Sequence, residues 1–233
     1  MELLAWALDR FGSRFAICTS FQDEGMVIVD MACKLRPGVR VFTLDTGRLP
    51  AETAVMIEMV EARYGVRIER VQADPGEVDR MVARHGADLF RDDPSLRKLC
   101  CHVRKTRPLQ RRLESLEAWA VGLRRDQNEE RAQTPKAERI DGRWKLSPLA
   151  DWTQQQVEEY LLEHKAPRHP LYAAGYGTIG CAPCTRPVAP GEDRRAGRWW
   201  WEKDGQKECG IHVRPDGTLA RTLDVLLDEI VVR

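Results

Sequence analysis

The chain has 233 residues, of which 42% are hydrophobic and 31% charged, and its formal net charge at pH 7 is +1. This is enough apolar sequence for one sizeable core, and a net charge near zero argues against a nucleic-acid-binding or membrane-surface protein. No apolar run approaches the ~20 residues of a membrane span, and the N-terminus lacks the basic start of a secretory signal. We therefore expect a cytoplasmic protein whose seven cysteines are thiols, ligands or catalysts.

The first two-thirds of the sequence alternates between strand-like and helix-like segments. Strands are expected at residues 14–20, 39–44, 66–71 and 118–123, and helices at residues 24–35 and 51–64. Gly65 occupies the position of a helix C-cap after the second helix. Repeated β-α-β units of this kind predict a parallel sheet flanked by helices, with a ligand at the carboxyl ends of the strands.

The character of the sequence changes after residue 126. Residues 128–143 are polar and charged, and residues 151–164 predict an amphipathic helix with Thr153 as its N-cap. Residues 167–217 are rich in Gly, Pro, Arg and Trp and show no clear periodicity. Since such a loop-rich stretch has little apolar sequence for a core of its own, a metal centre would explain how it is ordered.

Four cysteines give the strongest chemical signal: Cys100 and Cys101 form an adjacent pair, and Cys181 and Cys184 form a C-x-x-C pair. Four cysteines can hold either a zinc ion or a 4Fe-4S cluster. Neighbouring side chains on a helix diverge by about 100° around its axis, which suits one small ion poorly. A cluster offers each thiolate a separate iron. The pattern therefore favours a 4Fe-4S cluster, with zinc and plain thiols as alternatives.

Basic residues and a third cysteine site accompany this quartet. Residues 97–112 carry seven basic side chains and no acid, and Lys105, one helical turn after Cys101, should share its face. Cys209 lies near Lys207 and His212 and beside a glycine. Cationic neighbours and an accessible backbone are what a nucleophilic thiolate needs. A cysteine beside a histidine is more often incidental, so this hypothesis depends on the motifs around it.

Several motifs, in order along the chain, resemble those of assimilatory adenylyl-sulfate reductases, members of the sulfonucleotide (APS/PAPS) reductase family. They are TSFQ (19–22), LDTGR (44–48), KLCC (98–101), GLRRDQ (122–127), GCAPCTRP (180–187), PGEDRRAGRWWWE (190–202) and KECGIH (207–212). The similarity extends over residues 14–213. It implies an adenine-nucleotide α-hydrolase-like α/β fold, a parallel sheet flanked by helices, with a loop-rich C-terminal segment organised by an iron–sulfur cluster.

The resemblance also implies roles for individual residues. One 4Fe-4S cluster would be held by Cys100, Cys101, Cys181 and Cys184. Cys209 would be the catalytic nucleophile, with His212 and Lys105 beside the reacting group. The substrate-binding residues would be Ser20, Asp45, Thr46, Gly47, Arg125, Arg131, Arg195 and Arg198. Residues 1–198 would form the nucleotide-binding and cluster-binding reductase domain, and residues 199–233 a C-terminal segment that carries the catalytic cysteine and an extra tail.

The implied function is the thioredoxin-dependent reduction of adenosine 5′-phosphosulfate (APS) to sulfite and AMP through an S-sulfocysteine intermediate. This reaction belongs to sulfate assimilation and cysteine biosynthesis, and another dithiol could replace thioredoxin. The alternative is a cluster-containing reductase that also or instead uses the 3′-phosphorylated nucleotide (PAPS). A GGKDS-type pyrophosphate loop is missing, which argues against an ATP pyrophosphatase. An iron–sulfur redox sensor would not need Cys209 beside nucleotide loops.

Three further features complete the interpretation. Members of this family often end shortly after the position of His212, whereas this chain continues and includes an apolar run at residues 223–232. Cys18 and Cys33 are interpreted as small core residues, and the tryptophans at 199–201 as packing around the cluster. We expect neither a nucleic-acid nor a membrane partner, and the sequence leaves a homo-oligomer open.

Overall fold

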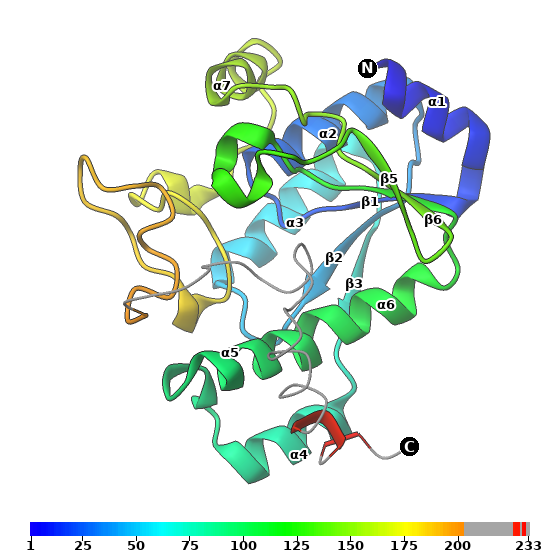
Figure 1. Cartoon of the computed structure of the whole chain (residues 1–233). Coiled ribbons are helices and arrows are strands. Elements are labelled where there is room, and N and C mark those ends of the chain that lie inside the picture. Colours follow the sequence, from blue (N-terminus) through cyan, green and yellow to red (C-terminus); the bar gives the residue numbers. More distant parts are fainter. Residues whose placement is uncertain (203–225, 229, 232–233) are drawn as a thin grey trace.

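The computed structural model describes residues 1–202, 226–228 and 230–231. Within these residues one six-stranded sheet has the order β3-β2-β1-β4-β6-β5 (Figure 1). The strands are β1 (Phe15–Cys18), β2 (Val41–Asp45), β3 (Ile68–Gln72), β4 (Ala118–Ala120), β5 (Ala137–Ile140) and β6 (Arg143–Leu146). Neighbouring strands are parallel except for the β5–β6 pair, which is antiparallel. The predicted parallel sheet flanked by helices is thereby confirmed.

Seven α-helices of the described chain surround this sheet or extend from it. They are α1 (Glu2–Phe11), α2 (Asp23–Leu35), α3 (Ala51–Tyr64), α4 (Pro75–His85), α5 (Pro94–Cys101), α6 (Arg107–Leu113) and α7 (Gln154–Glu163). A π-helical segment, His102–Thr106, connects α5 to α6. None of the helices in the described part of the chain is long and apolar enough to cross a membrane.

The two faces of the sheet bury alternate residues of the same strands, as the two-residue repeat of a strand requires. Phe15 and Ile17 of β1 belong to the main core, which α1, α2, α3 and α7 complete. Ala16 of β1 and Trp119 of β4 point to the other face, where Leu109 of α6 covers them. We call the larger cluster the sheet core.

Local sequence signals account for the helix boundaries next to the sheet. Gly65 ends α3 in the left-handed conformation, with φ 62°, as its position predicts. Thr153 caps α7 by accepting a hydrogen bond from the Gln156 N–H at 3.2 Å, and the Gln156 side chain accepts one from the Thr153 N–H at 2.8 Å. Both predicted caps are confirmed.

The β5–β6 hairpin was not expected from the sequence. The hairpin begins within residues 128–143, which the sequence indicates only to be polar and charged. The residues of β5 are all partly buried or exposed. An edge strand of this kind has no continuous apolar face, so it leaves a weak periodic signal.

A second apolar cluster forms beyond the sheet, around α4, α5 and the loop that precedes residue 202. We call it the cysteine core. Its buried members are Met81, Leu89, Phe90, Leu99, Cys100, Cys101, Val103, Cys181, Cys184, Trp199 and Ile230. Figure 1 shows α4 and α5 at the opposite end of the molecule from α1 and α7. The predicted domain division at residue 198 stays a prediction, because most of the C-terminal segment lies outside the described residues.

Candidate active site

A cavity of about 350 Å³ opens beside the carboxyl ends of β1, β2 and β4. Its lining includes Cys18 at the end of β1 and Thr19 just after it, Leu44 from β2, and Val121 and Leu123 just after β4. In the sheet, β2 lies on one side of β1 and β4 lies on the other side. The direction in which successive strands are added therefore reverses at β1. A crevice at such a reversal is where open α/β sheets bind ligands. We call this space the nucleotide cavity, after the ligand that the sequence resemblance leads us to expect.

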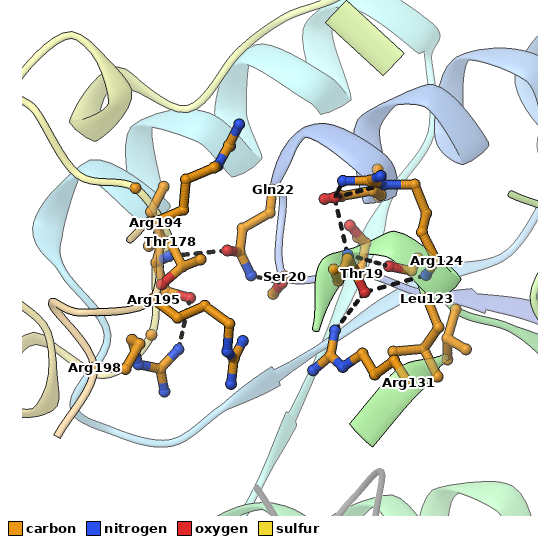
Figure 2. Close-up of a pocket in the computed structure, with 18 of the residues that line it drawn as sticks. Thr19, Ser20, Gln22, Leu123, Arg124, Arg131, Thr178, Arg194, Arg195 and Arg198 are labelled. Carbon is orange, nitrogen blue, oxygen red and sulfur yellow. Dashed lines mark hydrogen bonds and ion pairs between the residues drawn. The ribbon is translucent and has the colours of Figure 1, made fainter. Parts of the chain in front are cut away.

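The loop between β1 and α2 forms the floor of the nucleotide cavity. Thr19 Oγ1 accepts a hydrogen bond from the Phe21 N–H at 2.9 Å, and Phe21 has a φ of 57°. Gln22 Nε2 donates to Ser20 Oγ at 3.0 Å, while Gln22 Oε1 accepts from the Ile179 N–H at 2.9 Å (Figure 2). This side chain therefore joins the predicted Ser20 loop to a segment more than 150 residues later in the chain.

One end of the cavity is a network in which charges are paired. Arg124 donates to Glu24 Oε1 from Nε at 3.0 Å and from Nη2 at 2.9 Å, and Gln127 Nε2 donates to the same oxygen at 2.8 Å. Arg131 Nη1 donates to Gln127 Oε1 at 2.5 Å. Figure 2 shows Arg124, Leu123 and Arg131 together at this end. Its amides and apolar wall suit an uncharged, hydrogen-bonding group such as a nucleoside.

The other end of the cavity is cationic. Arg194, Arg195 and Arg198 reach it from one loop, and Thr178 lies beside them (Figure 2). Arg194 also pairs with Glu158 at 3.4 Å. Asp193 also lines the cavity. Since guanidinium groups match the oxygens of phosphate and sulfate, this end suits an anionic substituent. The cavity thus has a neutral end and an anion-binding end.

The four predicted ligands meet in a hollow of the cysteine core. Cys100 and Cys101 end α5, and Cys181 and Cys184 bracket a short turn. Each is 8–9% exposed. The hollow is also lined by Arg48, Phe90, Arg97, Arg104, Lys105 and Pro183. Four buried thiols among basic side chains fit what a cysteine-ligated iron–sulfur cluster would need, since the net charge of such a cluster is negative.

Burial keeps two of these thiols, Cys100 and Cys184, protonated at neutral pH. It raises the pKa of Cys100, against the lowering effect of Arg104, and raises the pKa of Cys184 to about 11. Metal ligation requires thiolates, so a bound cation or cluster would supply the missing stabilisation. Among the described residues no three His, Cys, Asp or Glu side chains are close enough to hold a single metal ion. A four-iron cluster spreads its four contacts over separate irons.

Lys105 connects the two sites, because it lines both the nucleotide cavity and the cysteine hollow. It lies in the π-helical segment, where the sequence suggested an ordinary α-helical turn after Cys101. The wider turn follows directly on the cysteine pair, and π-helical turns are frequent at functional sites. The predicted proximity of Lys105 to the cysteines agrees with the structure, although the local helix type differs.

The structure brings part of the predicted set to the nucleotide cavity. The residues that line it are Ser20, Lys105, Arg131, Arg195 and Arg198. The predicted loop of Asp45, Thr46 and Gly47 lies instead against the cysteine hollow. Thr46 Oγ1 is 3.3 Å from Cys181 Sγ, and Arg104 Nη1 donates to the Thr46 carbonyl at 2.8 Å.

One further predicted residue does not line the cavity, and two others cannot be placed. Arg125 is absent from the lining; it pairs with Asp151 and donates from Nε to the Thr134 carbonyl at 2.9 Å. Cys209 and His212 lie outside the described residues. The roles of Arg125, Cys209 and His212 therefore stay predictions.

Several cavity residues were not predicted from the sequence. They are Glu24, Arg124, Gln127, Thr178 and Arg194. Arg124 and Gln127 belong to the GLRRDQ motif, and Arg194 precedes the predicted Arg195, so motif membership could have pointed to them. Nothing local marks Glu24, because its partner is 100 residues away.

The fold and the cavity define an α/β protein with a ligand-sized cavity at the ends of its parallel strands, and a cysteine-rich hollow shares Lys105 with that cavity. Residues 14–187 match the phosphoadenosine phosphosulfate reductase domain. The chain is 45% identical over 216 residues to an adenosine 5′-phosphosulfate reductase of Allochromatium vinosum, covering 92% of this chain and 84% of that protein. The chain therefore belongs to the sulfonucleotide reductase family, whose members are oxidoreductases that act on a sulfur group.

Solved structures support the same fold. A phosphoadenylyl-sulfate reductase from Candida auris, in complex with phosphate, superimposes with a TM-score of 0.65 at 28% identity, covering 79% of this chain and 89% of that chain. An FMN adenylyltransferase of Candida glabrata shares the fold alone, with a TM-score of 0.57 at 13% identity, covering 96% of this chain and 81% of that chain. The predicted family and α/β fold are thus confirmed.

Proposed function

We propose that this chain reduces adenosine 5′-phosphosulfate to sulfite and AMP in sulfate assimilation, with thioredoxin or a similar dithiol as the reductant. The observation that carries this proposal is that Lys105 lines both the nucleotide cavity, which has a cationic end, and the hollow of the four cysteines. The name of the Allochromatium vinosum relative supports the same substrate.

The two ends of the cavity suggest how the substrate would lie. The nucleoside would occupy the neutral end, beside Leu123 and the Arg124–Glu24 network. The phosphosulfate would extend to Arg195 and Arg198, with Lys105 on the side of the cysteines. Cations here would stabilise the charge that develops on the departing AMP phosphate, and such stabilisation is often the largest contribution to catalysis.

The bond changes follow from a cysteine nucleophile. The Cys209 thiolate would attack the sulfur of the activated sulfate, forming an S–S bond and expelling AMP with the electrons of the broken S–O bond. One thiolate of the dithiol would then attack Cys209 Sγ and release sulfite. The second thiol would resolve the mixed disulfide, so the dithiol supplies both electrons and ends as a disulfide.

Cys100, Cys101, Cys181 and Cys184 would hold one 4Fe-4S cluster. When bound, such a cluster would supply a fixed anionic centre that orders the surrounding loops and balances the basic side chains near it. Lys105 would keep its charge directed at the substrate end, and Arg104 would keep the 45–48 loop in contact with the hollow through the Thr46 carbonyl.

The substrate is tested by comparing kcat/KM for APS and PAPS with thioredoxin as reductant. We expect an advantage of at least about 100-fold for APS, since an extra 3′-phosphate would need a cationic partner beyond those at the anion-binding end. Equal or reversed values would assign the protein to the PAPS-reducing alternative. No turnover of either nucleotide by protein with its full iron content would contradict the proposal.

The nucleophile is tested by the Cys209→Ser variant, with Cys33→Ser as the matched control. The first should form no sulfite yet keep its iron and its nucleotide affinity, because only the attacking thiolate is lost. Wild-type protein mixed with APS and no dithiol should release one AMP per chain. Mass spectrometry should find a sulfonate adduct on the Cys209 peptide. An adduct on Cys18 or Cys33 would refute the mechanism.

A further inference from the structure

Trp199 contacts two guanidinium groups in the cysteine core. The ring centroid of Trp199 is 4.2 Å from Arg97 Cζ and 4.4 Å from Arg198 Cζ. The three side chains are 1%, 1% and 7% exposed for Trp199, Arg97 and Arg198. A cation over an indole face is attracted by the ring, and the attraction is strongest where water is excluded. The indole therefore joins Arg97 of α5 to an arginine of the nucleotide cavity.

The two arginines differ in their charge partners. Arg97 Nε lies 2.5 Å from Glu202 Oε1, and both side chains are buried, so this pair is neutral overall. In the described part of the chain the Arg198 side chain has no carboxylate partner, and its one hydrogen bond runs from Nη1 to the Ile179 carbonyl at 3.4 Å. Its Nε is buried without a hydrogen-bond partner. Of the two arginines that contact Trp199, Arg198 is therefore the one whose positive charge is not balanced by a carboxylate.

The backbone around Trp199 holds the indole in an unusual position. Trp199 has a φ of 42°, a conformation that costs a non-glycine residue free energy and that persists only where the surroundings enforce it. Its N–H donates to the Cys184 carbonyl at 3.3 Å, and its carbonyl accepts from the Glu202 N–H at 3.0 Å. Strained backbone of this kind is concentrated at functional sites.

The Arg198 guanidinium is confined on a further side by Gly180. A Cβ at Gly180 would lie 2.5–2.6 Å from the guanidinium atoms of Arg198, closer than side chains approach one another. Arg198 therefore fits between a residue that has no side chain and the ring of Trp199. Few rotamers remain open to a side chain held in this way, which reduces the entropy lost on binding an anion.

We propose that Trp199 is a positioning residue, which holds the Arg198 guanidinium at the anion-binding end of the nucleotide cavity and is itself supported by the Arg97–Glu202 pair. This inference rests on the proposed function, in that the anion is the phosphosulfate of APS. Trp199 contributes to substrate affinity through Arg198, and it should not affect the binding of a ligand that lacks the anionic group.

The test measures the dissociation constants of APS and adenosine in a Cys209→Ser background, where no turnover occurs. Trp199→Leu should raise the dissociation constant of APS about tenfold, since the cation–π contact that holds Arg198 is lost. The dissociation constant of adenosine should stay within about twofold of its original value. Trp199→Phe keeps an aromatic face and should recover most of the affinity. Trp201→Leu is the matched control, because this neighbouring tryptophan packs against the cysteine core but, unlike Trp199, does not line the nucleotide cavity.

A double-mutant cycle separates positioning from a general structural role. In an Arg198→Ala background, Trp199→Leu should cause no further loss of APS affinity, whereas a structural role would weaken both ligands in both backgrounds. If Trp199→Leu does not fold, Gly180→Ala displaces Arg198 from the other side, and it should cause the same selective loss with unchanged iron content.

The outcomes distinguish this inference from the proposed function. Failure of the parent protein to bind APS would contradict both. Binding of APS by the parent, together with unchanged APS affinity in the Trp199→Leu variant, would contradict the positioning role alone.

Discussion

The sheet core and the cysteine core are both buried, yet they are built in different ways. In the sheet core, aliphatic residues such as Ile17, Met26 and Val60 are fully buried, and they lie on helices and strands with regular apolar spacing. The cysteine core contains four thiols, and the charged side chains of Arg97 and Glu202 are buried in the same region.

This difference indicates which of the two cores is stable without a bound ligand. Burying aliphatic side chains is favourable by itself, at roughly 25 cal/mol per Å² of apolar surface. Burying ionised or ligating groups is unfavourable unless each has a partner. Arg97 has Glu202 and Trp199 as partners. The four cysteines lie together among basic side chains, and a bound cluster would give each of their thiolates a partner. We therefore expect this core to depend on a cluster.

Removing one cysteine from the cysteine core should have the largest effect. Purified wild-type protein should be brown and contain about four iron and four sulfide per chain. Cys181→Ser should lose most of the iron and at least about 1,000-fold in APS turnover, since the loops around the cavity lose their common anchor. Stoichiometric zinc without sulfide, in protein prepared without air, would overturn the cluster assignment.

The matched substitution in the other core is Cys33→Ser. Cys33 packs against the sheet core, and burial, followed by the nearby Asp30, raises the pKa of its thiol to about 11. A thiol held neutral in this way acts as a small apolar side chain. The variant should keep its iron and its activity. Loss of iron from Cys33→Ser would mean that the two cores are not independent.

A smaller effect is expected where the two sites meet, at Lys105. Lys105→Ala should lower kcat/KM for APS about 50-fold, because hydrogen bonds to charged groups contribute ~1.5–3 kcal/mol. Iron content should stay near the wild-type value. Lys136→Ala is the control. Lys136 forms an ion pair with Asp151 at 2.5 Å, and it does not line the cavity. Loss of the cluster from Lys105→Ala would assign Lys105 to the cysteine core instead.

The smallest expected effect is the pH dependence of stability that comes from His169, which contacts α3 of the sheet core. His169 is 1% exposed, its Nε2 is 3.1 Å from Thr53 Oγ1 on α3, and its Nδ1 accepts from the Leu171 N–H at 3.3 Å. Burial lowers the pKa of His169. On acidification the unfolded state, with an ordinary pKa of about 6.5, therefore takes up a proton before the folded state does.

It follows that the stability contributed by His169 is complete above about pH 6.5 and declines as the pH falls below it. Urea unfolding at pH 7.5 and pH 5.5 should show a larger loss of stability for wild-type protein than for His169→Gln, which cannot titrate. The same pH dependence in both proteins would remove His169 as the cause. Iron content should not differ between them.

Most of the sheet core could be predicted from the sequence, because its signals are local. The α3 helix has the expected bounds, and the caps at Gly65 and Thr153 follow from residue types that favour those positions. The β5–β6 hairpin could not be predicted in this way, since its burial comes from pairing with β4 rather than from an apolar pattern of its own.

The candidate site was predictable to the extent that motifs mark it. Ser20, Arg195 and Arg198 were expected at the substrate and do line the cavity. The placement of Thr46 beside Cys181 could not be predicted, because it depends on how two loops 135 residues apart pack together. The partnership of Glu24 and Arg124 is equally non-local.

The π-helical segment after Cys101 has a consequence for how this protein can be engineered. A π turn has one residue more than an α-helical turn. Removing one residue before Lys105 would turn its side chain by about 100° around the helix axis relative to Cys100 and Cys101. Lys105 would then no longer border both the nucleotide cavity and the cysteine hollow. Engineering of this helix should therefore keep all five residues of the π-helical segment.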